Sequence, residues 1–435
     1  MPKVDLPAES IEDSPIAPAL PPADAIPAAR RHRPHGWLRH YAGFLTPNAT
    51  AAMPVLLERD REQRLRRLGA SIGDRAGQRL RRTRPRMRAL QAAPGARLRW
   101  HDVPVPAPPG PDWAIVHPIA CSTCDLDCGI ALGATQFALP LHLGHECVAE
   151  VLTIGERVST IKPGDRVIVP FQINCGTCPP CRAGRTGSCT SVPPASMYGM
   201  GLAGGLWGGA FSDQLPVPFA DAMLVALPEG IDPVAAASVA DNVCDAYRHI
   251  APYLPALLET DPGAEVLIVA AMSSRTPFGS SAPLYAGLIA RALGARNVSL
   301  ADARVHVRAH AERLGLNALK PRELRRRAPV PLVVDATVDD LGVSLSNTAA
   351  DGICSSLGGF HRSTQVPLLQ MYVRNATLHI GRTHTRHLIP QVLELMLDGQ
   401  FHPENVITSV ASLDDAPSAL REHFLGGGVK TVLTA

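Results

Sequence analysis

Residues 174–189 read NCGTCPPCRAGRTGSC and hold four of the ten cysteines in a chain of 435 residues. These cysteines follow the spacing C-x2-C-x2-C-x7-C: Cys175, Cys178, Cys181 and Cys189. Such local spacing does not suit a disulfide framework in a long chain and is typical of a metal site in a reducing compartment. Four thiolates can surround a tetrahedral zinc ion with no open position, which predicts a structural zinc. An iron–sulfur cluster is the alternative, because soft thiolates suit both, but Pro and Gly in the spacers favour zinc.

The sequence on either side of this lobe predicts two kinds of structure. Residues 87–230 contain short apolar runs separated by Pro and Gly, such as DRVIVP (165–170), which predicts an all-β, barrel-like domain. From residue 231 to 399, apolar strands alternate with helical segments, as in EVLIVAA (265–271) and PLVVDA (331–336). This alternation predicts a doubly wound parallel sheet, so the fold class is α/β. The tail, residues 400–435, returns to mixed strands.

Residues 1–86 differ from the rest in charge and composition. They carry a net charge of +7, whereas residues 87–435 carry −4, and the whole chain has +3. Residues 56–86 could form a basic helix with a thin apolar stripe, which would suit a nucleic-acid or membrane arm. We favour the simpler interpretation, a disordered basic extension outside the folded domains.

The composition also argues against secretion and membrane insertion. The N-terminus is acidic and Pro-rich and lacks the apolar segment of a signal peptide. The longest uncharged run, residues 186–212, is rich in Gly and is no membrane helix. We therefore expect a cytoplasmic protein without a membrane partner. The negative charge of residues 87–435 and the low aromatic content, 4%, argue against a nucleic-acid partner.

Three motifs in order carry a family resemblance. Gly144, His145 and Glu146 form a GHE triplet, GDRV follows at 164–167, and the four-cysteine lobe comes next. Together with a cysteine at a strand end and a later dinucleotide-binding region, this order resembles the zinc-containing medium-chain alcohol dehydrogenases over about residues 87–435. The resemblance implies a GroES-like catalytic domain, 87–230 completed by 400–435, and a Rossmann-type domain, 231–399. It also implies a homodimer or homotetramer.

The resemblance implies a second, catalytic zinc, whose first ligand is a cysteine at the end of a strand. The segment HPIACSTCDLD (117–127) offers Cys121 and Cys124. We favour Cys124, because its 21-residue gap to His145 is typical of the family and Asp127 falls where relatives often have Asp.

The choice of cysteine decides the proton relay. If Cys121 were the ligand, Thr123 would take the relay position that usually holds Ser or Thr. With Cys124 as ligand this position is Leu126, which has no hydroxyl, so Asp127 or a water would have to serve.

The other catalytic residues follow from the same resemblance. His145 supplies an imidazole nitrogen, and Glu146 beside it is the family's second-shell or exchanging carboxylate. Asp241 matches the third ligand, because it stands four residues before Asp245, where relatives carry a Thr that lines the nicotinamide site. The alternative for Asp241 is a helix N-cap. A Cys-His-Asp set leaves a fourth position for water or a substrate oxygen.

The nucleotide end departs from the family pattern. The loop after the strand 266–269 offers Gly279 with Ser280 and Ser281, and Pro283 stands where relatives have their last Gly. Backbone N–H groups at this turn approach the pyrophosphate in a dinucleotide-binding unit, and Pro has none. Asp302 ends the second strand, where a carboxylate binds the adenosine ribose and disfavours a 2′-phosphate, although Arg304 stands close by.

These residues lead to one principal hypothesis and one alternative. The first is a zinc-dependent, NAD-linked dehydrogenase, with two zinc ions per chain, that acts on an alcohol or aldehyde. The alternative is a zinc-stabilised, non-catalytic member of the fold that has lost cofactor binding, which the glycine-poor loop and Leu126 favour.

Overall fold

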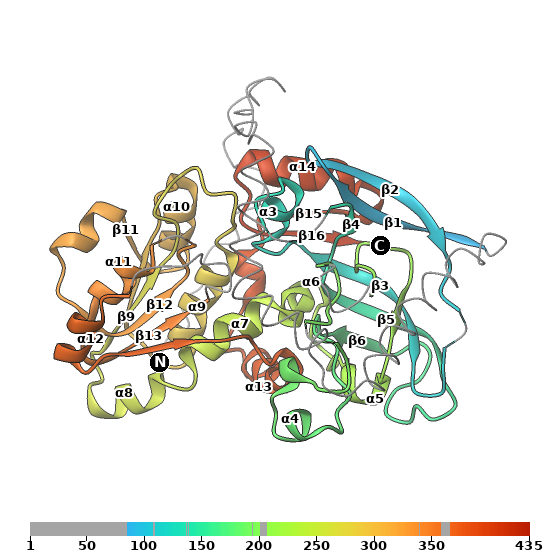
Figure 1. The fold of residues 1–435 in the computed structure, drawn as a ribbon, viewed down its shortest axis with the longest axis horizontal. Coiled ribbons are helices and arrows are strands. Elements are labelled where there is room, and N and C mark those ends of the chain that lie inside the picture. Colours follow the sequence, from blue (N-terminus) through green and yellow to red (C-terminus); the bar gives the residue numbers. More distant parts are fainter. Residues whose placement is uncertain are drawn as a thin grey trace, which may run out of the picture.

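The computed structural model describes residues 85–435 except 108, 136, 138, 194, 201–206, 339 and 358–365. The predicted extension therefore lies outside the described residues, apart from its last two positions. Figure 1 shows the strands in two groups at opposite ends of the molecule, with helices α7, α9 and α13 between the groups. No described helix combines the length and apolar character that a membrane span requires.

The first half is built on a seven-stranded sheet and a smaller three-stranded one. The larger sheet has the order β15-β16-β3-β5-β6-β8, and β7 pairs with β3. Its strands are β3 (Ala114–Ser122), β5 (Glu146–Ile154), β6 (Arg166–Val169), β7 (Leu215–Val217), β8 (Val225–Ala226), β15 (Ser409–Ser412) and β16 (Thr431–Thr434). The smaller sheet has the order β2-β1-β4: β1 (Arg86–Ala93), β2 (Arg97–Pro104) and β4 (Leu141–His142).

The second half is a six-stranded parallel sheet with the order β11-β10-β9-β12-β13-β14. Its strands are β9 (Glu265–Val269), β10 (Asn297–Ala301), β11 (Asn317–Leu319), β12 (Val330–Asp335), β13 (Thr348–Ser356) and β14 (Thr377–Ile380). Numbered along the chain from β9, this order is 3-2-1-4-5-6, which is the doubly wound dinucleotide-binding arrangement. The predicted α/β class, with a parallel sheet after residue 231, is confirmed.

Helices cover both sheets and fill the space between them. The α-helices are α3 (Asp127–Ala131), α4 (Pro179–Arg182), α5 (Ala220–Met223), α6 (Pro233–Ala236), α7 (Asn242–Ile250), α8 (Leu254–Thr260), α9 (Ser281–Ala292), α10 (Val305–Arg313), α11 (Leu341–Ser346), α12 (Leu368–Arg374), α13 (Thr385–Leu397) and α14 (Ala416–Gly426). Between α6 and α7 the chain forms a 3₁₀ turn, η5 (Ala237–Ala240). Asp241 follows this turn.

The apolar core forms several clusters, of which the first (around Cys147 and Ala149) lies within the first half and the second (around Val148 and Leu284) joins the two halves. Side chains alternate between the faces of a strand, so Cys147 and Ala149 of β5 pack in the first core cluster and Val148 points the other way. Val148 packs in the second cluster, which also contains Leu284 of α9 and Ile268 of β9. The sheet of the first half is therefore buried against the helices of the second half.

The tail of the chain returns to the first half. Strand β16 pairs antiparallel with β3, and β15 pairs parallel with β16. In Figure 1 these two red strands lie beside the turquoise β3. This sheet membership supports the predicted division into residues 87–230 with 400–435 and residues 231–399, whose boundaries remain a proposal.

Candidate active site

The four cysteines of the sequence motif come together in one lobe. A ligand atom of each lies within 4.8 Å of the others: Cys175, Cys178, Cys181 and Cys189. Cys178 precedes the short helix α4, which carries Cys181, and Cys189 follows the 3₁₀ turn η4 (Thr186–Ser188). The amide of Cys178 donates to the sulfur of Cys175 over 3.4 Å. Tight turns of this kind bring four sulfurs around one point.

The surroundings of Cys175 and Cys178 favour the thiolate form, whereas burial raises the pKa of Cys181 and Cys189. Burial acts to raise the pKa of Cys178, but amides and hydroxyls such as those of Thr190 lower it to about 5. Burial is likewise outweighed at Cys175, where hydrogen bonds with Ser191 and Thr177 lower the pKa to about 7. Hydrogen bonds that favour the charged form prepare these sulfurs for a cation.

A second cluster of candidate ligands lies between the two halves of the structure. Ligand atoms of Cys124, His145, Glu146 and Asp241 all lie within 4.8 Å of one another, and all four residues are buried. Cys124 follows β3, His145 and Glu146 stand at the start of β5, and Asp241 joins η5 to α7. Asp241 makes no side-chain cap to α7; its Oδ2 instead lies 3.3 Å from both Cys124 Sγ and His145 Nε2. The N-cap alternative for Asp241 is therefore not what the geometry shows.

The structure separates the two cysteines that competed for the first ligand position. Cys121 lies within β3, and its thiol donates to the carbonyl of Ala210 over 3.4 Å in the first core cluster. Cys124 lies beyond the strand end and reaches the cluster with His145. Thr123 is buried, and its hydroxyl accepts a hydrogen bond from the amide of Thr431.

The donor set of the second cluster fits a zinc ion. Among the described residues neither ring nitrogen of His145 has a hydrogen-bond partner, although Nε2 faces Asp241 at 3.3 Å. Burial raises the pKa of the Cys124 thiol well above its usual value, and neighbouring carboxylates add to the effect. A bound cation would satisfy a His145 nitrogen and oppose the rise in the Cys124 pKa, because it would accept the nitrogen lone pair and stabilise the thiolate.

Beside this cluster lies an ion pair that the sequence did not suggest. Lys430 and Glu146 are fully buried, and Lys430 Nζ lies 2.8 Å from Glu146 Oε2. Burial raises the pKa of Glu146 to about 7, although Lys430 opposes this rise. Burial alone would lower the pKa of Lys430, but Glu146 and other anions hold it above its ordinary value.

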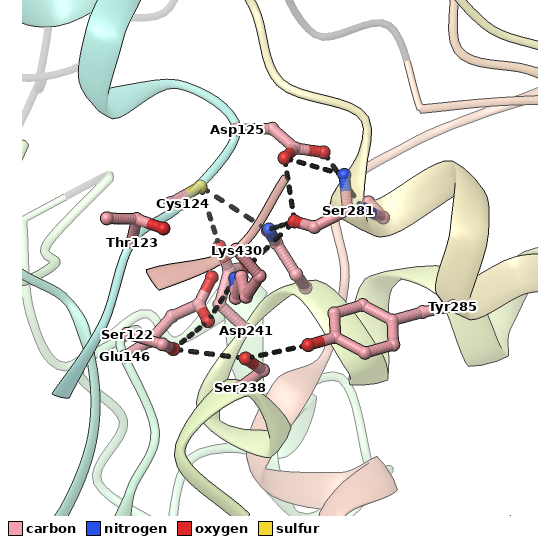
Figure 2. Close-up of polar contacts among 12 residues, drawn as sticks. Ser122, Thr123, Cys124, Asp125, Glu146, Ser238, Asp241, Ser281, Tyr285 and Lys430 are labelled. Atoms are coloured by element: carbon pink, nitrogen blue, oxygen red, sulfur yellow. Dashed lines mark hydrogen bonds and ion pairs between the residues drawn. The ribbon is translucent and has the colours of Figure 1, made fainter. Parts of the chain in front are cut away.

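A chain of hydroxyl groups leads away from Glu146 (Figure 2). Ser122 donates to Glu146 Oε2 over 2.6 Å, Ser238 donates to Ser122 over 3.1 Å, and the Tyr285 hydroxyl donates to Ser238 over 3.1 Å. The four residues come from β3, β5, η5 and α9. These hydrogen bonds connect the candidate metal cluster to helix α9, which follows the first strand of the parallel sheet.

Asp127 supports the turn that contains Cys124. Its Oδ2 accepts the amide of Cys124 over 2.8 Å, and its Oδ1 is buried without a hydrogen-bond partner. The carboxylate therefore holds the turn that presents the thiol. The side chain of Leu126 packs against the first core cluster and brings no hydroxyl, as the sequence indicated.

The residues predicted to bind the nucleotide lie together, but their polar groups bond to one another. Asp302 follows β10 and is fully buried. Its Oδ1 accepts from Arg304 Nε over 3.0 Å, and its Oδ2 accepts from the Ser280 hydroxyl over 2.9 Å and from Arg304 Nη2 over 2.8 Å. Arg304 also donates to the carbonyl of Phe278 over 2.8 Å. The carboxylate expected at the ribose thus holds the loop before α9.

The remaining predicted residue, Asp245, is paired as well. Its Oδ1 lies 2.6 Å from Arg248 Nε in the next turn of α7. Arg248 Nη1 is buried without a hydrogen-bond partner. The structure therefore shows an ion pair at the position where the resemblance implies a hydroxyl.

A thiolate lobe, a mixed-ligand cluster and a doubly wound sheet together define a protein of the alcohol dehydrogenase class. Residues 110–229 match the family model of the alcohol dehydrogenase GroES-like domain. L-galactonate-5-dehydrogenase of Escherichia coli (strain K12) is 30% identical over 329 residues, which cover 72% of this chain and 87% of that protein. The chain therefore belongs to the zinc-containing medium-chain alcohol dehydrogenase family, a family of oxidoreductases, and the resemblance seen in the sequence is confirmed.

Two further similarities extend over both halves. A Mycobacterium tuberculosis protein named "Probable zinc-binding alcohol dehydrogenase" is 28% identical over 355 residues, which cover 76% of this chain and 83% of that protein. The solved structure of alcohol dehydrogenase TADH from Thermus sp. ATN1 superposes with a TM-score of 0.70 at 26% identity. The superposition covers 80% of this chain and 99% of the Thermus chain.

Proposed function

We propose that this chain is a zinc-dependent oxidoreductase that transfers a hydride between an alcohol or aldehyde substrate and NAD(H). The observation that carries the proposal is the buried cluster of Cys124, His145 and Asp241, with Glu146 beside it. One sulfur, one imidazole nitrogen and one carboxylate leave the fourth position of a tetrahedral ion for a substrate oxygen. The cluster faces α9 of the doubly wound half, where a dinucleotide would lie.

When bound, zinc supplies a Lewis acid that polarises the substrate oxygen, and the nicotinamide accepts the hydride. The protein's own residues position the ligands and the carboxylate beside them. Asp127 holds the Cys124 turn through its amide, and Lys430 and Ser122 orient Glu146 by charge and hydrogen bond. Because Leu126 has no hydroxyl, Asp127 or a water would have to accept the proton of the alcohol. The thiolate lobe holds a second, structural zinc ion.

The proposal is tested by zinc quantification on the purified chain and by a screen of alcohols for NADH formation. We expect two zinc ions per chain, and turnover with at least one alcohol that disappears in His145→Ala. That variant should keep one zinc and remain folded, because His145 belongs to the open cluster alone. One zinc in the unmodified chain, unchanged by His145→Ala, would contradict the assignment of the open cluster.

A matched pair of cysteine variants tests which sulfur is the ligand. Cys124→Ser should lower the zinc content from two ions to one and abolish turnover, because serine oxygen is a far poorer zinc ligand than thiolate. Cys121→Ser should keep both ions, since its sulfur contacts the carbonyl of Ala210 in the core. Atomic absorption and steady-state rates measure both. Exchange of the two results would make Cys121 the ligand and Thr123 the relay.

One observation favours the alternative of a cofactor-free member of the family. The polar groups that would contact a dinucleotide are already bonded within the chain: Asp302 with Arg304 and Ser280, and Asp245 with Arg248. Titration with NADH separates the two candidates, because the alternative predicts no binding at millimolar nucleotide by a protein that still holds zinc.

A further inference from the structure

The N-terminus of helix α9 is capped by a side chain from the other half of the protein. Asp125 follows Cys124 in the turn after β3, and its Oδ1 accepts from the amide and the hydroxyl of Ser281 over 2.9 and 2.7 Å. Its Oδ2 accepts from the amide of Ala282 over 2.9 Å. Figure 2 shows the carboxylate of Asp125 facing the first turn of the helix, with Ser281 between it and Lys430.

This carboxylate uses the amide donors that the helix offers. The first turn of a helix has N–H groups without intrahelical partners, and these make it an anion site. Here Ser281 and Ala282 donate to Asp125, Pro283 has no N–H, and Leu284 donates to the carbonyl of Ser280 over 3.2 Å. The residue at the cap position, Ser280, makes no side-chain cap of its own.

The loop before α9 is shaped around the same contact. The amide of Gly279 donates to the carbonyl of Asp125 over 2.8 Å, and a Cβ at Gly279 would lie 2.9 Å from the Cα of Asp125. The ring of Phe278 packs on Gly129 of α3, where an added Cβ would lie 2.7 Å from the ring. Glycine at both positions therefore allows the loop to close on the Asp125 turn.

A buried lysine, already paired with Glu146, lies beside this anion site. Lys430 is fully buried, and its Nζ lies 3.5 Å from the Ser281 hydroxyl that Asp125 accepts from. Asn242 donates to the same hydroxyl over 2.8 Å. Backbone amides at a helix N-terminus, such as those of Ser281 and Ala282, are the groups that bind the pyrophosphate in a dinucleotide site.

We propose that Asp125 is an internal competitor for the cofactor diphosphate: its carboxylate occupies the α9 N-terminus, so a dinucleotide binds only when Asp125 moves out. The inference rests on the proposed function, because it concerns the nucleotide of that same reaction. The apparent affinity of a ligand falls by the fraction of molecules in the binding-competent state. A tethered carboxylate, held at high effective concentration, keeps that fraction small.

The test compares nucleotide binding by the zinc-loaded full chain and three variants. Asp125→Gly removes the competitor, and Asp125→Asn keeps a capping oxygen without the charge. Asp232→Asn is the matched control, because Asp232 caps α6 by accepting the amide of Val234 over 2.7 Å, away from the nucleotide site. Fluorescence titration with NADH, and calorimetric titration with ADP, report the affinities. Zinc content checks that the Cys124 turn is intact.

We expect NADH and ADP to bind at least about tenfold more tightly to Asp125→Gly, with Asp125→Asn between it and the unmodified chain and Asp232→Asn unchanged. Hydrogen exchange at the amides of Ser281 and Ala282 should accelerate in Asp125→Gly without nucleotide. Equal or weaker binding by Asp125→Gly, with the unmodified chain binding NADH, would overturn the inference and leave Asp125 as a helix cap. Absence of nucleotide binding in every zinc-loaded variant would overturn the proposed function together with it.

Discussion

Cys178→Ala is expected to release one zinc ion and unfold the thiolate lobe. The lobe contains only the short turns α4 and η4, so four sulfurs within 4.8 Å of one another are its main source of order. Structural zinc contributes about 10–16 kcal/mol to the folding of isolated zinc-finger peptides, so its loss exceeds what the remaining contacts of the lobe can offset. Metal analysis and limited proteolysis of residues 174–191 measure the effect.

The lobe also transmits its order to the second half. The amide of Gly187 donates to His384 Nδ1 over 3.2 Å, just before α13 begins. We therefore expect Cys178→Ala to lower the thermal midpoint of the whole protein as well as to open the lobe. Cys354→Ala is the control, because Cys354 is buried in the third core cluster and should keep both zinc ions. A Cys178→Ala protein with full zinc content and unchanged proteolysis would show that the lobe is held by packing alone.

Lys430→Met is expected to destabilise the folded protein by about 3–5 kcal/mol, because it leaves the Glu146 carboxylate buried without its partner. Both side chains are fully buried, so solvent cannot replace the lysine. Chemical denaturation of the zinc-loaded chain gives the free energy of unfolding. Lys162→Met, at an exposed position, should change it by less than about 0.5 kcal/mol.

A double variant separates the pair from the packing of the lysine chain. In Lys430→Met with Glu146→Gln no buried charge remains unpaired, so part of the lost stability should return. If the double variant is as unstable as the sum of the two single variants, the ion pair contributes no coupling and the effect of Lys430 is one of packing.

The parts of the site that the sequence could predict are those with short spacing. The lobe cysteines lie within fifteen residues, so their local spacing alone suggests a metal site, whereas the roles of His145 and Glu146 came from the family resemblance. The parallel sheet follows from apolar strands alternating with helices, a pattern that repeats along the second half. Choosing Cys124 over Cys121 depended on the 21-residue gap to His145, and the geometry brings Cys124 to that histidine.

The residues that the sequence could not predict make contacts across long separations. Asp125 meets Ser281 over 156 positions, and Glu146 meets Lys430 over 284. Each of these residues is polar and unremarkable in its own segment, since neither periodicity nor a motif marks it. Only the tertiary fold brings them together: Asp125 meets helix α9 of the second half, and β16 returns Lys430 to the sheet that contains β5. Arg304 was visible beside Asp302 in the sequence, but its second bond, to the Phe278 carbonyl, required the folded loop.

The pairing of β16 with β3 also sets an order of events during synthesis. Thr431 bonds to Thr123 across 308 positions, so at about 5–20 residues per second β3 waits roughly 15–60 s on the ribosome for this neighbour. Until then residues 120–122 of β3 lack the strand that covers them in the described structure, since β7 pairs only with residues 114–116, and Glu146 lacks the ammonium that neutralises it. Unpaired strand edges invite association between chains, so the nascent protein is most exposed to aggregation during this interval. Strand β16 therefore completes both the surroundings of Glu146 and the protection of this part of the sheet edge.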